Sequence, residues 1–418
     1  MATHMQETQY KVYGYRWVVL LVFMAVAGVN QLLWITFASV TSDAVRFYGV
    51  GDLEIGILSL IFMLVYIIVS VPASWAIDTW GVRVAVGIGA ALTGGFGLLR
   101  GLLANSYTGV LIAQIGIAVG QPFILNAITT VAARWFPVRE RATAAGFGSL
   151  AAYLGILLGL ALTPFVVIGS GMGGMLLIYG IASVIAALIF FVFVRENPPT
   201  PPCAPEQQTR SLVFDGLKGM LRQKEFLILL PIFFVGLGVF NAVTTWVEEI
   251  VAPRGFTATQ AGIAGGLMIV GGIVGALIVP ALSDRAHRRI PFIVVALAGA
   301  VLGLLGLTFA GTAALLMASA FLLGFFLLTA GPIGFQYGAE ITFPAPEGTS
   351  NGLLLMMGQV SGVLFILGMD LFKAPDTGAM TAPLVVLIVL TAASLLLCTQ
   401  LKESKMIAAS EVAKTAAA

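Results

Sequence analysis

Long apolar stretches make up most of the chain, and short polar or proline-containing breaks separate them. A helix needs about 20 mainly apolar residues to cross a bilayer core about 30 Å thick. Twelve stretches of about this length follow one another, at residues 17–40, 53–74, 82–103, 108–133, 143–167, 174–194, 226–250, 259–282, 291–309, 313–339, 348–371 and 382–400. The pattern predicts an all-α membrane protein with twelve transmembrane helices.

One polar interruption, at residues 196–225, is much longer than the others and lies between the sixth and seventh predicted spans. Five prolines fall within residues 198–205, and prolines this dense cannot continue a helix. Residues 211–222 then show an amphipathic pattern suited to a membrane surface. We expect two six-helix bundles, residues 1–195 and 226–401, joined by a linker at 196–225 that contains an amphipathic helix, and a tail at 402–418.

The composition agrees with a lipid environment, since 59% of residues are hydrophobic and only 10% are charged. All but four of the 21 Lys and Arg fall in one set of alternate loops, the exceptions being Arg46, Arg100, Arg254 and Lys373. Because basic loops stay in the cytoplasm, this bias predicts a multi-pass protein of the cell (inner) membrane, with both termini and the linker cytoplasmic. The net charge of +2 follows from these loops and gives no reason to expect nucleic acid as a partner. No small-residue cleavage site follows the first span, so we expect a retained helix rather than a signal peptide.

Residues about 206 positions apart match in kind, as expected of a transporter built from two similar halves. Asp78 and Arg83 follow the second span, and Asp284 and Arg285 follow the eighth. A carboxylate and a guanidinium at facing helix ends can form a latch that closes the cytoplasmic side, although basic loops can also serve topology alone. Matching Phe-Pro pairs precede two further gate candidates, Glu140 and Glu347.

The acidic-basic loop resembles the loop motif of the major facilitator superfamily. The first copy has Thr79 where a basic residue is usual, and the second has Ala286 and His287 where a glycine is usual. The resemblance implies that the two six-helix bundles are pseudo-symmetric halves of the major facilitator fold.

Two runs, YGYRWVVLLVFMAVAGVNQLLWITFASV and EITFPAPEGTSNGLLLMMGQVSG, resemble the feline leukaemia virus subgroup C receptor family. Members of that family are associated with haem export and with transport of choline or ethanolamine. The resemblance implies a small-molecule transporter with amine-type substrates, and it matches Trp34 and Gln359 to substrate-contacting positions. Tyr153 and Asn241 depart from the family, which has a glutamine and a tyrosine there.

Polar side chains inside the predicted spans outline a transport path, because lipid cannot form hydrogen bonds with them. Taken one at a time, each can instead form an interhelical hydrogen bond. The candidates for substrate binding are Asn30, Gln31, Trp34, Gln121, Asn126, Tyr153, Asn241, Gln336, Tyr337 and Gln359.

Strong charges are absent from the predicted mid-membrane positions, and Glu248 and Glu249 come nearest, towards the outer end of the seventh span. Either one of them faces the cavity and couples transport to protons, or both reach the outer interface.

These features predict a secondary active or facilitative transporter that moves a small organic solute by alternating access, since no GxxxxGK[ST] phosphate loop is present. The alternatives are a proton-coupled transporter of an organic anion or a drug-like or lipidic compound, a membrane-embedded lipid enzyme, and a channel or non-transporting receptor. His4 and His287 are the only histidines and lack metal-ligand spacing, so we expect no enzyme, metal or cofactor. The expected partners are a solute, the lipid bilayer and a proton or other coupling ion, and we expect a monomer.

Overall fold

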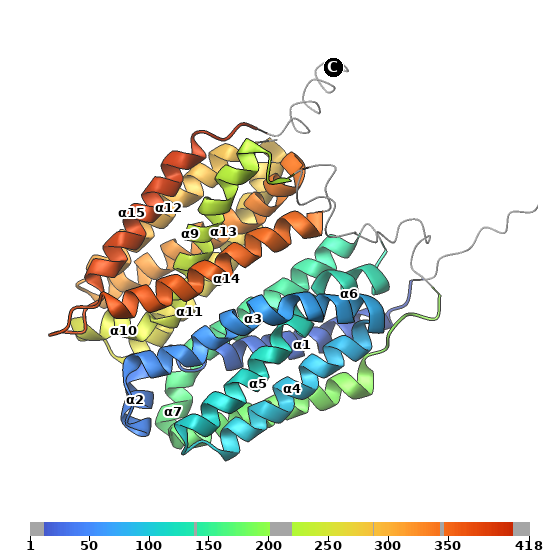
Figure 1. Cartoon of the computed structure of the whole chain (residues 1–418), viewed down its shortest axis with the longest axis horizontal. Coiled ribbons are helices and arrows are strands. Elements are labelled where there is room, and N and C mark those ends of the chain that lie inside the picture. The colour runs from blue at the N-terminus through green and yellow to red at the C-terminus, as the bar shows by residue number, and fades with distance from the viewer. Residues whose placement is uncertain (1–11, 138–139, 201–219, 287, 343–346, 404–418) are drawn as a thin grey trace, which may run out of the picture.

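The computed structural model describes residues 12–137, 140–200, 220–286, 288–342 and 347–403 (Figure 1). Apolar segments without water must satisfy their backbone groups internally, and these residues accordingly form helices. The first half contains α1 (Tyr15–Ile35), α2 (Thr41–Tyr48), α3 (Asp52–Trp80), α4 (Val82–Leu102), α5 (Tyr107–Leu125), α6 (Ile128–Trp135) and α7 (Arg141–Phe193). The second half contains α9 (Lys224–Thr245), α10 (Val247–Val251), η3 (Ala252–Arg254), α11 (Ala258–Ala286), α12 (Ile290–Phe309), α13 (Ala313–Thr342), α14 (Glu347–Leu371) and α15 (Thr381–Cys398).

Eleven of the described helical segments are long and apolar enough to cross a membrane. One of them, α7, has 53 residues and a non-helical Gly171 (φ 71°) inside it. Because a helix rises only about 1.5 Å per residue, a segment of that length is far longer than one bilayer is thick, and α7 provides two crossings. The described part of the chain therefore crosses twelve times, which confirms the predicted fold class.

The seventh crossing ends earlier than predicted. α9 stops at Thr245 and the chain turns at Trp246 into the separate short helix α10, so Glu248 and Glu249 lie beyond the membrane-spanning helix instead of three-quarters along it. The predicted amphipathic helix at 211–222 falls mostly outside the described residues, as does most of the 402–418 tail.

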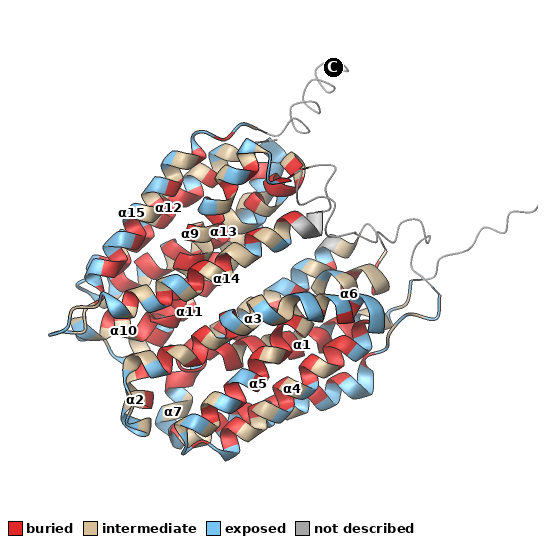
Figure 2. Ribbon diagram, in the orientation of Figure 1, coloured by how far each residue is buried: buried red, intermediate tan, exposed pale blue. Residues whose placement is uncertain are grey.

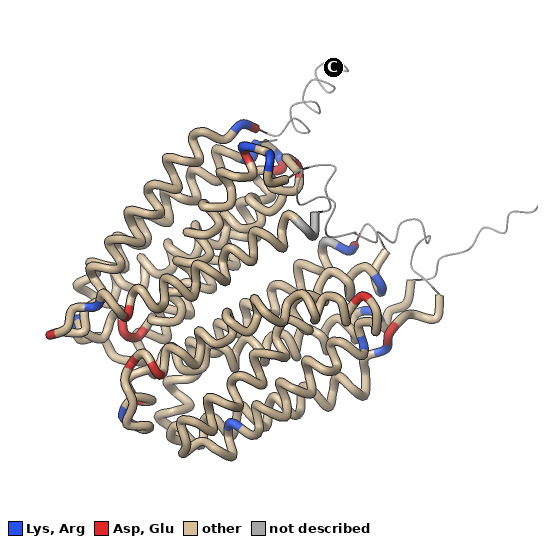
Figure 3. Tube along the Cα trace, viewed as in Figure 1, with Lys and Arg blue, Asp and Glu red and all other residues tan. Residues whose placement is uncertain are grey.

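The two bundles lie side by side (Figure 1). We call the end with Tyr15 and Leu401 the terminal face and the end with α2 and α10 the distal face. Charged residues gather at these two ends, and the described helices between them carry almost none (Figure 3). Exposed residues cover the outer surfaces of the bundles, as expected for helices that face lipid (Figure 2).

Three apolar cores among the described residues show how the halves meet. The largest contains residues of both halves, such as Trp34, Ile55, Trp246 and Ile366, and it lies towards the distal face. Of the other two, one is built from first-half residues and one from second-half residues, and both lie towards the terminal face. The halves therefore share a core at the distal end and have separate cores at the terminal end.

Candidate functional site

The distal face is closed by polar contacts between the halves. The Glu248 carboxylate accepts a hydrogen bond from the Ser42 backbone N–H (3.0 Å), and the Glu248 N–H donates to the carbonyl of Ala38 (3.4 Å). Lys373, in the loop after α14, forms an ion pair with Asp52 at the start of α3 (2.8 Å). These contacts join the tips of α2 and α3 to α10 and the end of α14.

A buried tryptophan packs next to these contacts, on the side towards the shared core. The Trp246 ring packs against Gly56 of α3, where a Cβ atom would overlap the indole. Its Nε1–H donates to the Ile366 carbonyl of α14 (3.1 Å). The distal closure therefore combines an apolar plug with a polar rim.

Carboxylates gather around Lys373 at this rim. Burial, together with the nearby Asp52 and Glu248, raises the pKa of Glu249 from 4.5 to about 7, and Lys373 opposes that rise. Lys373 is also within 2.8 Å of Asp370. The excess of carboxylates makes the rim attractive to cations and sensitive to protons near neutral pH.

The terminal face of the first half contains a cluster around Glu196. The carboxylate accepts from the backbone N–H groups of Val82 (3.0 Å) and Arg83 (2.6 Å) at the start of α4, and it forms an ion pair with Arg134 of α6. The Arg83 side chain itself is exposed. Asp78 is also exposed and interacts electrostatically with Arg134. An acidic group at a helix N-terminus is favourable because it meets free N–H groups.

The turn before α4 depends on Gly81. Its φ of 91° is in the left-handed region that favours glycine, and a Cβ atom there would overlap the Glu196 carboxylate. The corresponding position of the second half is His287, which lies outside the described residues.

The second half repeats this arrangement at the equivalent helix. Glu403 accepts from the backbone N–H groups of Arg289 and Ile290 (both 3.1 Å) at the start of α12. The Arg289 guanidinium then forms ion pairs with Glu340 (3.0 Å) and with Asp284. The Asp284 side chain is 64% exposed, so its carboxylate can accept a further partner from outside this cluster.

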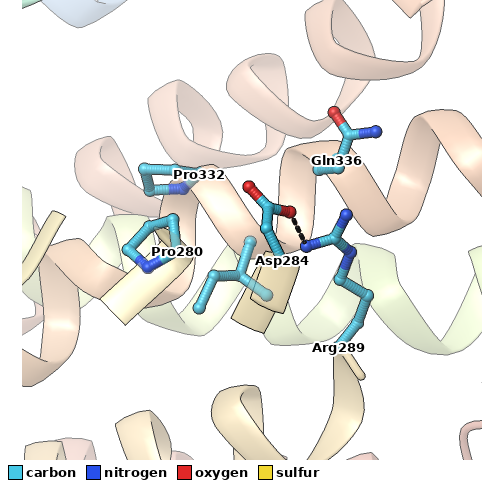
Figure 4. A pocket seen from close by; sticks show the side chains of 6 residues that line it. Pro280, Asp284, Arg289, Pro332 and Gln336 are labelled. Atoms are coloured by element: carbon cyan, nitrogen blue, oxygen red, sulfur yellow. Dashed lines mark hydrogen bonds and ion pairs between the residues drawn. The ribbon is translucent and has the colours of Figure 1, made fainter. Parts of the chain in front are cut away.

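A pocket of about 310 Å³ adjoins this ion pair, between α11 and α13 (Figure 4). The Asp284 carboxylate points at the Arg289 guanidinium, and two prolines lie on the other side of Asp284. The pocket is at the terminal end of one half, whereas Trp34 belongs to the core shared by both. Its lining consists of Pro280, Asp284, Arg289, Pro332, Ile333 and Gln336.

The remaining predicted gate residues do not form one group. Glu140 forms an ion pair with Arg16 (2.9 Å) within the first half. Arg285 is exposed at the end of α11. Glu347 begins α14, and its side chain lies outside what the structure describes.

Trp34 is 6% exposed and lies in the core shared by the two halves. Its Nε1–H donates to the Ser59 carbonyl of α3 (3.1 Å). Asn30, one turn earlier, is buried and donates to the Thr93 hydroxyl of α4 (3.0 Å), and Gln31 donates to the Asn30 side chain (3.3 Å). Asn30 and Gln31 therefore make hydrogen bonds inside the first half, and the indole N–H is likewise used within that half.

In the second half, Asn241 of α9 donates to the Gly358 carbonyl of α14 (3.1 Å). The next residue of α14, Gln359, is half-buried. Tyr153 is half-buried and packs against the shared core, and Gln121 is 5% exposed on α5. The structure therefore places Trp34 and Tyr153 at the shared core and Gln359 beside a helix contact of the second half.

Asn126 lies at the break between α5 and α6. Its amide accepts from the Tyr66 hydroxyl (2.7 Å) and donates to Ser70 and to the Ser74 hydroxyl (3.0 Å), all on α3. This polar patch joins two helices of one half on the terminal side of the shared core.

Gln336 and Tyr337 are adjacent in sequence but differ in environment. Gln336 is exposed at the pocket and donates to Glu340 (3.1 Å). Tyr337 is fully buried in the terminal core of the second half and donates to the Lys402 carbonyl (2.7 Å). Neither lies in the shared core with Trp34.

One buried charge was not predicted: Arg100 lies near the end of the predicted span 82–103, and the loop count assigned it to the adjoining loop. Arg100 lies in the last turn of α4 and is fully buried. The missed members of the terminal clusters are Arg134, Glu196, Arg289, Glu340 and Glu403. Glu196 and Glu403 occupy equivalent positions of the two halves, and this correspondence is the signal for the pair in the sequence.

A model of the family described as Major Facilitator Superfamily matches residues 13–366. The chain belongs to the major facilitator superfamily. It is 30% identical to solute carrier family 49 member A3 of Xenopus tropicalis, over 88% of this chain and 80% of that protein. It is also 30% identical to the choline/ethanolamine transporter flvcr2b of Danio rerio, over 85% of this chain and 77% of that protein. These relatives confirm the predicted resemblance, and the chain is a multi-pass membrane protein that transports solutes.

Solved structures of the superfamily share the fold. A bacterial homologue of the human lysosomal transporter Spinster, in an inward-facing and unoccupied conformation, matches with a TM-score of 0.76 and 15% identity over 93% of this chain and 98% of that one. A D-xylose-proton symporter matches with a TM-score of 0.69 and 16% identity, over 93% and 98%. At these identities the likeness concerns the fold alone.

Proposed function

We propose that this major facilitator protein carries a small organic cation of the amine type across the cell membrane, with the terminal face in the cytoplasm. The observation that carries the proposal is the place of Trp34, which lies in the core shared by the two halves with its N–H already bonded to Ser59, so that a ligand would meet its ring faces once that core opens. An indole face attracts an ammonium group, with about 2 kcal/mol available when both partners are desolvated. The named choline and ethanolamine relatives support the same substrate class.

The charge at the distal rim supports a cation over an organic anion. Asp52, Glu248, Asp370 and Lys373 all interact electrostatically with Glu249, so carboxylates outnumber the ammonium group here, and such an excess of one sign raises the local concentration of oppositely charged solutes. An amide such as Gln359 can orient a hydroxyl or amine without the cost of burying a second charge.

The cores support alternating access. One core joins the halves at the distal end and each half has its own core at the terminal end, which corresponds to a carrier open to the terminal face. In the alternate state the terminal ends must approach each other. The exposed Asp284 is then available to a basic group of the first half, and we assign it, with Asp78 of the pseudo-equivalent loop, to the cytoplasmic latch. We propose domain limits at 1–195 and 226–401 on the same grounds, and in this proposal each monomer carries both halves of the transport path.

The experiment is uptake of labelled choline and ethanolamine into liposomes that contain the purified protein. Saturation and counterflow are expected, and an organic acid of similar size should not compete. Trp34→Phe should raise the apparent KM about three- to tenfold, which is a loss of affinity, because phenylalanine is the weaker cation ligand. Gln359→Ala should raise it as well.

Matched controls come from residues far from the shared core. Trp80→Phe alters an exposed tryptophan at the end of α3, and Gln400→Ala alters an exposed glutamine after α15. Both should transport with wild-type affinity. If Trp34→Phe and Gln359→Ala also keep wild-type affinity in folded protein, this assignment of the site is wrong.

A further inference from the structure

The Arg100 side chain joins the end of α4 to the end of α1. One guanidinium nitrogen donates to the Leu33 carbonyl (3.0 Å) and to the Gln114 side-chain oxygen (2.9 Å). The other contacts the Thr36 hydroxyl at 3.5 Å. The guanidinium carbon lies 5.7 Å from the centre of the Phe37 ring. One side chain thus contacts several positions around the end of α1.

The partners of this arginine are all neutral. Within the part of the chain that the structure describes, no carboxylate forms an ion pair with Arg100, and its Nε–H is buried without a hydrogen-bond partner. A charge in a membrane-spanning helix is costly and is usually retained for function. The placement is favourable in one respect, because a cation at a helix C-terminus interacts with its free carbonyls.

Gln114 strengthens the same junction. Its side-chain N–H₂ donates to the Leu33 carbonyl (3.3 Å) and to the Leu58 carbonyl of α3 (3.0 Å). Arg100 and Gln114 together therefore fix the end of α1 against α3, α4 and α5. We call these two side chains the α1 clamp.

The segment held by the α1 clamp carries two parts of the transport machinery. Trp34 directly follows Leu33, the residue that both clamp side chains bind. Ala38 and Ser42, a few residues later, make the hydrogen bonds to Glu248 that close the distal face. A shift at the end of α1 would therefore move both Trp34 and the distal closure.

We propose that Arg100 is a positioning residue that holds the outer end of α1 in the geometry required for distal closure. Without the α1 clamp, the segment from Leu33 to Ser42 has fewer anchors, and its contacts to the second half weaken. The closed distal state then becomes less populated relative to the open one. This inference rests on the proposed alternation of the two faces, but not on the identity of the solute.

The test measures the rate at which a thiol reagent modifies Ser42→Cys in protein held in lipid nanodiscs. The two native cysteines are replaced first, as Cys203→Ser and Cys398→Ala. Replacing residue 42 removes the contact of its hydroxyl with Glu248 but leaves its backbone N–H available, and every variant is compared in the same Ser42→Cys background. Labelling requires no solute, so failure of choline transport and failure of this proposal give separate results.

The informative variant replaces both clamp side chains, as Arg100→Leu with Gln114→Leu. The Leu33 and Leu58 carbonyls lose their side-chain donors in this variant, so we expect a lower melting temperature, and labelling is measured on protein that remains folded. Labelling should be about tenfold faster, the factor expected from loss of one charge-assisted hydrogen bond. A folded double variant that labels at the wild-type rate would show that the clamp only stabilises the first half.

Two further variants keep the test decisive. Arg100→Lys retains the charge but is shorter and has one nitrogen in place of two, so it cannot keep the Leu33, Gln114 and Thr36 contacts together, and labelling should be intermediate. Wild-type labelling of Arg100→Lys would contradict the proposal even if the double variant fails to fold. Ser183→Ala is the control, because it removes a buried hydrogen bond between α7 and α4 and leaves the clamp intact. Its labelling rate should equal that of wild type.

Discussion

Gly262→Ala should open the distal face. Gly262 lies near the start of α11 and faces α7 of the other half, and a Cβ atom there would lie 2.5 Å from the Leu160 carbonyl oxygen. Ordinary contacts of Cβ atoms begin near 3.4 Å, so the two helices would have to separate by several tenths of an ångström. The obstacle is backbone and cannot rotate away. Because α7 and α11 belong to different halves, the strain can be relieved by moving the halves apart at this end.

The expected magnitude follows from overpacking, which costs about 1–3 kcal/mol in a well-packed interior. Applied only to the distally closed state, that cost shifts the ratio of closed to open protein about 5- to 150-fold. The assay is the modification rate of Ser42→Cys, which should rise by a factor within this range. The terminal side should become less accessible in parallel, since the two faces alternate.

Gly271→Ala provides the matched control on the same helix. A Cβ atom at Gly271 would meet the Phe321 carbonyl oxygen even more closely, but Phe321 belongs to α13 of the same half. This variant should lower the melting temperature without changing the labelling rate of Ser42→Cys. If Gly262→Ala also lowers only the melting temperature, the halves do not part along α7 and α11.

Three further predictions concern the charged groups. The pKa of Glu249 is about 7 in the closed state and near 4.5 once the side chain is exposed, so protonation of Glu249 favours closure. The closed state therefore becomes less stable as pH rises from about 5 to 7. Labelling of Ser42→Cys, corrected for thiol ionisation, should rise over this range, and Glu249→Gln should remove the rise. Lys373→Met should speed the same labelling by up to about fivefold at pH 8, because the partly exposed ion pair with Asp52 contributes up to about 1 kcal/mol to closure. An unchanged rate would show that the Asp52 contact is not part of the closure. Asp284→Asn should raise the accessibility of Gln336→Cys at the terminal face and slow transport, whereas the exposed Asp376→Asn should do neither.

The fold was predictable because it depends on a repeated physical requirement. Each bilayer crossing needs a long apolar stretch, and α1, α4 and α12 agree with their predicted spans to within a few residues. The errors occur where a helix breaks at the membrane surface. Trp246 ends α9 by burying its ring against Gly56, a contact between segments far apart in the sequence that no local pattern contains.

The candidate site was predictable only in part, because a polar residue inside a span can face a cavity or another helix. Asn30 and Asn241 use their amides for helix contacts, and Tyr337 binds the backbone near the end of α15. Hydropathy and spacing do not distinguish these cases. Arg100 was missed for a related reason, since an arginine one turn from a helix end reads as part of a loop although its side chain turns inward.

The correspondence between the two halves fails at two kinds of position. At one, the equivalent residues have charges of opposite sign, and at the other, only one of the two equivalent residues is charged. Arg134 of the first half corresponds to Glu340 of the second, and each forms an ion pair at the terminal end of its own half. At the distal end, Arg254 donates to the carbonyls that end α12, and its counterpart in the first half is Tyr48, which interacts electrostatically with Arg100. In each half an arginine therefore binds carbonyls at a helix end. Arg100 of α4 does so in the first half and Arg254 of η3 in the second, so the two arginines are not at equivalent positions.

Such exchanges have a consequence for transport. If the two halves carried identical charges at their facing terminal ends, closure of that face would bring like charges together. With an arginine at position 134 and a glutamate at position 340, the equivalent positions of the two halves have opposite signs. Each of these charges is paired within its own half, Arg134 with Glu196 and Glu340 with Arg289, whereas Lys373 and Asp52 attract each other across the halves at the distal end. The departure from strict symmetry therefore removes one source of like-charge repulsion when the terminal ends approach each other.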